Sequence, residues 1–245
     1  MKNTLFILIL FIGQLTTAQS KTFDVKSFDK VIVSPHIQAT FVKGNKESVV
    51  IEKSTVSMDK VNVEVNGKTL RVYLDDAKEV TKSEKIKENG YTRKRSIYKG
   101  TVLTATITYT SLEELSLRGE ETFVCKSPID QDKFRLKIYG ESQVYLNEVA
   151  LQELHTTIYG ESFLEVKKGS TGHQKFTAYG ETKINTLGVA NKSTKITAYG
   201  EGSYRVNVSE RLKVTAYGEA TVAYQGNANV DRGLIIGEAT IQRID

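Results

Sequence analysis

The most regularly spaced residues that could do chemistry are the glutamates of a repeated Gly-Glu pair. Successive pairs lie 21, 20, 20, 20, 18 and 19 residues apart. The seven pairs begin at Gly119, Gly140, Gly160, Gly180, Gly200, Gly218 and Gly237. A tyrosine precedes five of these glycines. Carboxylates and aromatic rings at such a spacing suit acid–base chemistry, cation binding or contacts with sugars.

Apolar residues alternate with polar ones on both sides of each glycine. The residues two places before the glycine are Leu117, Ile138, Ile158, Ala178, Ala198, Ala216 and Ile235. Such alternation predicts strands with one buried face. A unit of this length cannot form its own core, so stacking of the repeats is expected. The sequence therefore predicts an all-β fold, a right-handed parallel β-helix or β-solenoid with turns of about 20 residues.

The same alternation places the tyrosine before each glycine and the glutamate after it on the solvent side. Since coils of a solenoid stack at about 4.8 Å, these side chains should form two rows along the axis. The candidate ligand-binding residues are Tyr139, Tyr159, Tyr179, Tyr199, Tyr217, Glu141, Glu161, Glu181, Glu201 and Glu219.

Each row has a structural and a functional interpretation. The tyrosines either stabilise the stack, because like aromatic neighbours across strands are favourable, or offer flat faces to sugar rings. The glutamates repel one another, and either water and salt screen them or a cation binds them. Apart from such a cation, the sequence predicts no cofactor and no metal site.

An enzyme is a third interpretation, because stacked carboxylates resemble the pairs used in glycoside hydrolysis. Such catalysis requires two carboxylates in unlike environments, whereas a row of equivalent glutamates supplies like ones. The three histidines, His36, His155 and His173, show no metal-ligand spacing. We therefore predict a protein that is not an enzyme and has no catalytic residues.

The start of the chain indicates export. Lys2 is followed by an apolar run from Leu5 to Leu15 and a small residue at Ala18, which together predict a signal peptide over residues 1–18. The expected location is the periplasm or the cell surface, with no membrane span in the mature chain. The formal charge of +5 falls to +4 without Lys2, which is too mild to indicate a nucleic-acid partner. Cys125 follows Phe-Val and is predicted to be a small core residue.

Residues 19–110 are less regular and are predicted to form a β-rich cap of the same domain, with the repeats over 111–245. A hairpin is expected around Asn66-Gly67, a pair typical of type I′ turns. Residues 78–99 carry eight Lys or Arg against three Glu. They are predicted to form a solvated loop, with a polyanion-binding finger as the alternative.

Four segments resemble, in this order, a known family of exported bacterial domains: the family described as "putative auto-transporter adhesin, head GIN domain". They are Phe28 to Val33, FVKGNKESVVIE, VNVEVNGKTLRVYL and SLEELSLRGE. The resemblance implies a β-helical domain with a cell-envelope role in Bacteroidetes-like bacteria. The expected partner is an envelope polysaccharide or envelope protein. An adhesion or binding module and a scaffold or sensing module both remain open.

Overall fold

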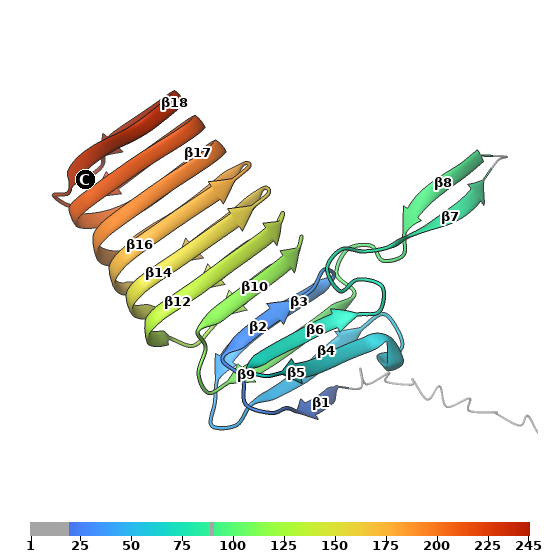
Figure 1. The fold of residues 1–245 in the computed structure, drawn as a ribbon. Helices are drawn as coiled ribbons and strands as arrows, with labels where there is room; N and C mark the ends of the chain where they lie inside the picture. Colours follow the sequence, from blue (N-terminus) through green and yellow to red (C-terminus); the bar gives the residue numbers. More distant parts are fainter. Residues whose placement is uncertain (1–19, 89–90) are drawn as a thin grey trace, which may run out of the picture.

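The computed structural model describes residues 20–88 and 91–245, which form an almost entirely β structure (Figure 1). The predicted signal peptide lies outside the described residues. The one helical segment in the described part is a single 3-10 turn, η1 (Met58–Lys60). No described helix has the length and apolar character needed to cross a membrane.

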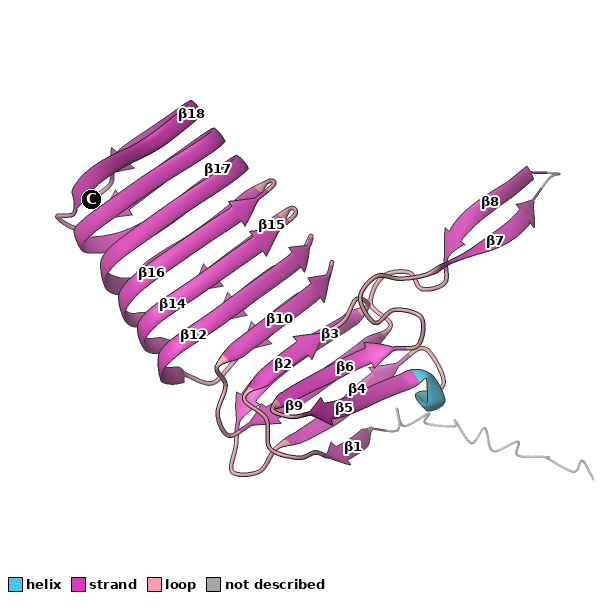
Figure 2. Cartoon of the chain, viewed as in Figure 1, coloured by secondary structure: helices cyan, strands magenta, loops and turns pink. Residues whose placement is uncertain are grey.

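The repeats form a stack of parallel coils, as the sequence predicts. In each coil a long strand reaches the glycine, the chain bends there, and a second strand follows. The strands are β10 (Glu114–Gly119), β11 (Thr122–Cys125), β12 (Ile129–Gly140), β13 (Gln143–Leu146), β14 (Val149–Tyr159), β15 (Ser162–Val166), β16 (Gly169–Tyr179), β17 (Thr182–Gln225) and β18 (Asn229–Arg243). Figure 2 shows these coils side by side along one axis. Equivalent residues of adjacent repeats are in register, as Ile138 is with Ile158.

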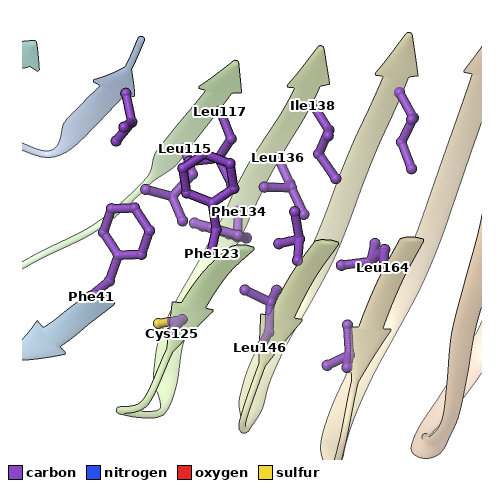
Figure 3. Packing of buried hydrophobic residues seen from close by; sticks show 14 of the residues in the cluster. Phe41, Leu115, Leu117, Phe123, Cys125, Phe134, Leu136, Ile138, Leu146 and Leu164 are labelled. Atoms are coloured by element: carbon purple, nitrogen blue, oxygen red, sulfur yellow. The ribbon is translucent and has the colours of Figure 1, made fainter. Parts of the chain in front are cut away.

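The inward positions form one continuous core. Leu136 and Ile138 before the bend, and Val144 and Leu146 after it, are at most 1% exposed. Figure 3 shows the side chains of Leu136, Ile138 and Leu146 between the strands of the coils. Cys125 belongs to this core, which confirms its prediction, and burial raises the pKa of its thiol to about 11.

The first coils are assembled out of chain order. They use β2 (Lys30–Val33), β3 (Ile37–Lys43), β6 (Thr69–Leu74) and β9 (Leu103–Tyr109). Strand β2 pairs in parallel with β10 on one side and β6 on the other, while β3 lies in the same way between β11 and β9. The parallel stack therefore crosses residue 110, and the division there into a cap and repeats stays a prediction.

Antiparallel strands lie at the N-terminal end of this stack. They are β1 (Lys21–Asp24), β4 (Ser48–Ser54) and β5 (Val61–Asn66). Strands β5 and β6 form the hairpin predicted around Asn66-Gly67, and Gly67 has φ +58°. These strands end the parallel pairing, so the first coil does not present a parallel edge.

The prediction of a solvated loop over residues 78–99 is wrong in its conformation. The segment contains β7 (Ser83–Glu88) and β8 (Tyr91–Ser96), which form a separate two-stranded antiparallel ribbon. Figure 1 shows the ribbon projecting away from the stack. Asn89-Gly90 between the strands is the same hairpin signal that was recognised at Asn66-Gly67. The many charged residues of the segment favour the interpretation as a solvated loop, although this pair favours a hairpin.

The last coil is less covered than the inner ones. Leu234 and Ile236 of β18 are each 57% exposed. Inward residues such as Ile235 and Ile241 are partly buried and pack on the core from one side. The free edge of the sheet therefore carries apolar side chains.

Candidate binding surface

The five tyrosines that precede the glycines form one stacked row, called here the tyrosine row. Adjacent ring centroids lie 5.2, 4.7, 4.7 and 4.8 Å apart from Tyr139 to Tyr217, and the planes differ by 6° or less. In-register pairing of the coils imposes this arrangement, because each Tyr lies opposite the Tyr of the next coil.

Stacking covers the faces of these rings. Each inner ring has a neighbour on both sides, and the guanidinium of Arg118 lies 4.7 Å from the ring centroid of Tyr139. At the other end, Ile236 is in register with Tyr217. Sugar rings therefore cannot stack on the inner faces, and that part of the sequence interpretation is wrong. The row presents its ring edges and hydroxyl groups to solvent.

Two members of the tyrosine row are exposed and three are half-buried. Tyr159 is 41% exposed and Tyr199 is 36% exposed. Across the described residues, no side-chain hydrogen bond involves a hydroxyl of the tyrosine row. Each hydroxyl both donates and accepts, so the row offers a regular line of such groups.

The glutamates that follow the glycines form a second exposed row, the glutamate row, beyond the bend. It consists of Glu141, Glu161, Glu181, Glu201 and Glu219, all of them exposed. No ion pair within the described chain involves this row. Two shallow hollows lie along it, one of about 230 Å³ and one of about 180 Å³, and Glu181 lines both.

The described residues contain no group of three acidic, His or Cys side chains placed to hold a metal ion together. A cation on the glutamate row stays a prediction. Solvent exposure lowers the repulsion between the glutamates, which supports screening by water and salt.

A cavity of about 520 Å³ lies where the rows meet the N-terminal coils. It is bounded by the bends of three coils and by the segments at the base of the ribbon. Glu79 pairs with Arg118 and Arg71 at 2.6 Å each. His36 bonds the Gly100 carbonyl through Nδ1 at 2.8 Å and the Thr81 hydroxyl through Nε2 at 2.7 Å, which ties both ends of the ribbon segment to the bend.

Glu121 also lines this cavity, and sequence reasoning missed it. It is 5% exposed, and its carboxylate accepts a hydrogen bond from the Glu120 N–H at 3.0 Å. Burial raises the pKa of this carboxyl above its ordinary value of 4.5. The signal was visible, because the other repeats carry a small residue two places after the glycine. Glu121 fills the space beside Gly119, which indicates a structural role at this bend.

The comparisons identify the family of this chain. Residues 27–228 match the sequence profile of the family described as "putative auto-transporter adhesin, head GIN domain". The chain belongs to this family. No curated protein matches the sequence.

Several solved structures share the fold. A putative adhesin from Bacteroides fragilis has a TM-score of 0.76 and 18% identity, over 92% of this chain and 96% of its own. A putative adhesin from Parabacteroides merdae has a TM-score of 0.67 and 17% identity, over 93% and 96%. A protein from Parabacteroides distasonis described as a putative lipid binding protein has a TM-score of 0.64 and 17% identity, over the same shares.

Membership of the head GIN family points to an exported, adhesion-like module and away from an enzyme. The geometry agrees with this, since the members of the glutamate row share one exposed environment. Glycosidic catalysis requires a protonated and an ionised carboxyl on either side of the scissile bond. The buried Glu121 carboxylate instead bonds to the backbone of its own bend.

Proposed function

We propose that the protein is a non-catalytic binding or adhesion module of the cell envelope that holds a hydroxyl-rich envelope polymer along the tyrosine and glutamate rows. The observation that carries the proposal is a line of tyrosine hydroxyls beside a line of carboxylates, neither of which has a side-chain partner among the described residues. Hydroxyls and carboxylates bind sugar hydroxyls by hydrogen bonds, and charge-assisted bonds are the stronger ones. A polymer with a repeat close to the coil spacing would meet the same groups on each coil.

Removing the hydroxyls while keeping the stack tests this proposal. The variant Tyr159→Phe/Tyr179→Phe/Tyr199→Phe retains three stacked rings and loses three hydroxyls. We expect wild-type unfolding and reduced retention of the mature protein on immobilised envelope material. Separating the envelope extract into polysaccharide, lipid and protein fractions identifies the class of ligand. The lipid fraction is included because one structural neighbour is described as a putative lipid binding protein.

A second variant serves as the stability control. Replacing the same three tyrosines with Thr removes all four ring contacts between Tyr139 and Tyr217. At about 0.5–1.5 kcal/mol for each contact, this loses about 2–6 kcal/mol. If the Phe variant binds envelope material as the wild type does, the tyrosine row is structural and the proposal fails.

A scaffold or sensing module that binds another envelope protein is the second candidate. The observation that favours it is the free edge of β18, where Leu234 and Ile236 are exposed. An unpaired strand edge with apolar side chains suits pairing with a protein strand. This function predicts that the wild type is retained on the protein fraction of the envelope extract. Leu234→Lys/Ile236→Lys should lose this retention, and the Phe variant should keep it.

A further inference from the structure

The outer side of the long strands carries two more rows beside the tyrosine row. The basic row lies four residues before the tyrosines and consists of Arg135, His155, Lys175, Lys195 and Lys213. The threonine row lies between them and consists of Thr157, Thr177, Thr197 and Thr215. The register aligns His155 with Lys175 and Lys175 with Lys195. Because alternate residues of a strand share a face, the three rows lie on the same side of the sheet.

Two of the five members of the basic row form ion pairs, and three do not. The acids near it are already engaged. Glu114 lies opposite Arg135 and pairs with Lys137 at 2.7 Å. Glu153 pairs with Lys133 at 2.8 Å and with His155 at 3.1 Å. Asp231 pairs with Arg211 at 2.6 Å and with Lys213 at 3.4 Å.

No ion pair in the described chain involves Arg135, Lys175 or Lys195, and all three are exposed. Like charges directly opposite one another in a sheet are unfavourable. Burial lowers the pKa of His155, which lies between Arg135 and Lys175 in this row. The sheet therefore presents three unpaired cations in one row, two of them on adjacent coils, that attract a partner with negative charge along its length.

The other rows define how such a partner lies. The half-buried threonines are short, so the longer side chains of the basic and tyrosine rows stand on either side of them. The glutamate row lies beyond the bend and repels anions there. Negative groups are thus directed to the basic row and hydroxyl groups to the tyrosine row.

We propose that the polymer bound by this surface is an acidic linear polysaccharide, which lies over the threonine row with its carboxylates toward Arg135, Lys175 and Lys195 and its hydroxyls toward the tyrosine row. This inference rests on the proposed function and names the class of its ligand. A polyuronate fits this chemistry because each sugar unit carries one carboxylate together with hydroxyls, at a repeat comparable to the coil spacing.

The basic ribbon is the competing site for an anion. In β7 and β8, Lys85 lies opposite Lys94, and Lys87 shares their face. No ion pair of the described residues involves these three lysines. The ribbon therefore provides a matched control, since neutralising three of its lysines removes the same charge as neutralising three cations of the sheet.

Binding of polygalacturonate and of its methyl-esterified form to the mature protein tests the inference, with biolayer interferometry as the readout. The wild type is expected to bind the acid form at least about tenfold more tightly than the ester, about 1.4 kcal/mol. This preference should shrink between about 0.02 M and about 0.5 M salt. Arg135→Gln/Lys175→Gln/Lys195→Gln is expected to weaken binding of the acid form about tenfold, and Lys85→Gln/Lys87→Gln/Lys94→Gln is expected to leave it unchanged.

Three results would overturn the inference: equal binding of both forms, no binding of either, or loss of binding in the ribbon variant alone. The first leaves the proposed function intact if Tyr159→Phe/Tyr179→Phe/Tyr199→Phe still loses binding to the ester. The second also leaves it intact if the wild type is retained on the envelope polysaccharide fraction and the Phe variant is not. The third places the anion on the ribbon.

Discussion

The contact between coils at the glycine bend can be tested by adding a single methyl group. Gly160 has φ +111°, a conformation that L residues rarely adopt. A Cβ at Gly160 would lie 2.3 Å from the carbonyl oxygen of Gly140 on the adjacent coil. The variant Gly160→Ala therefore strains the backbone and forces two coils apart.

The two effects add. Strain at a sparsely populated backbone conformation costs about 1–3 kcal/mol. Moving the coils apart weakens hydrogen bonds between them, such as that from the Phe163 N–H to the Ser142 carbonyl, which is 2.9 Å long. Each such bond contributes about 0.5–1.5 kcal/mol, so the variant should lose about 2–4 kcal/mol of unfolding free energy.

Gly67→Ala is the matched control. Gly67 also has a positive φ, +58°, but a Cβ there would meet no atom within 4 Å. The control should lose about 1–2 kcal/mol from backbone strain alone. Urea unfolding followed by far-UV circular dichroism and tyrosine fluorescence measures both variants, and coincident transitions justify the comparison. If Gly160→Ala costs no more than Gly67→Ala, close packing of the coils does not require the repeated glycines.

Two further perturbations test the core and the buried carboxyl. Ala198 is 1% exposed, so Ala198→Leu should cost about 1–3 kcal/mol by overpacking, whereas the outward-facing Thr197→Leu should cost much less; equal urea midpoints would contradict the alternation. Burial raises the pKa of Glu121, so the stability linked to its protonated form is present below its ordinary pKa of 4.5 and is lost as pH rises through the raised value. Glu121→Gln should therefore gain stability relative to the wild type as the pH rises above 4.5 in thermal unfolding, and a difference independent of pH would refute this.

The repeated part of the fold could be predicted because each repeat shows the same alternation of apolar and polar residues. The period-two alternation placed Ile138 and Ala198 inside and the tyrosine row outside, and burial confirms both. The stacking that covers the faces of the tyrosine rings is a consequence of the same repeat spacing. Rings on coils about 4.8 Å apart leave no space between them for a sugar ring.

The N-terminal coils could not be predicted, because their bend carries no Gly-Glu pair. Strands β2 and β3 join at Ser34-Pro35-His36, and His36 takes the positive φ, +70°, that glycine takes in the repeats. Its ring is held by Thr81 and Gly100, which are distant in sequence. A conformation maintained by tertiary contacts leaves no local signal, so neither this coil nor the cavity beside it was visible in the sequence.

The arrangement of the rows links stability to binding. Lines of like charge are unfavourable in a sheet, yet this fold has one on each side of the tyrosine row. Four stacked contacts within that row stabilise it by about 2–6 kcal/mol, which offsets repulsion on the same coils. The ring faces therefore hold the coils in register, and that register keeps the charged rows aligned. The groups left for a ligand are the hydroxyls and the unpaired charges, whose replacement should change binding and leave the stack intact.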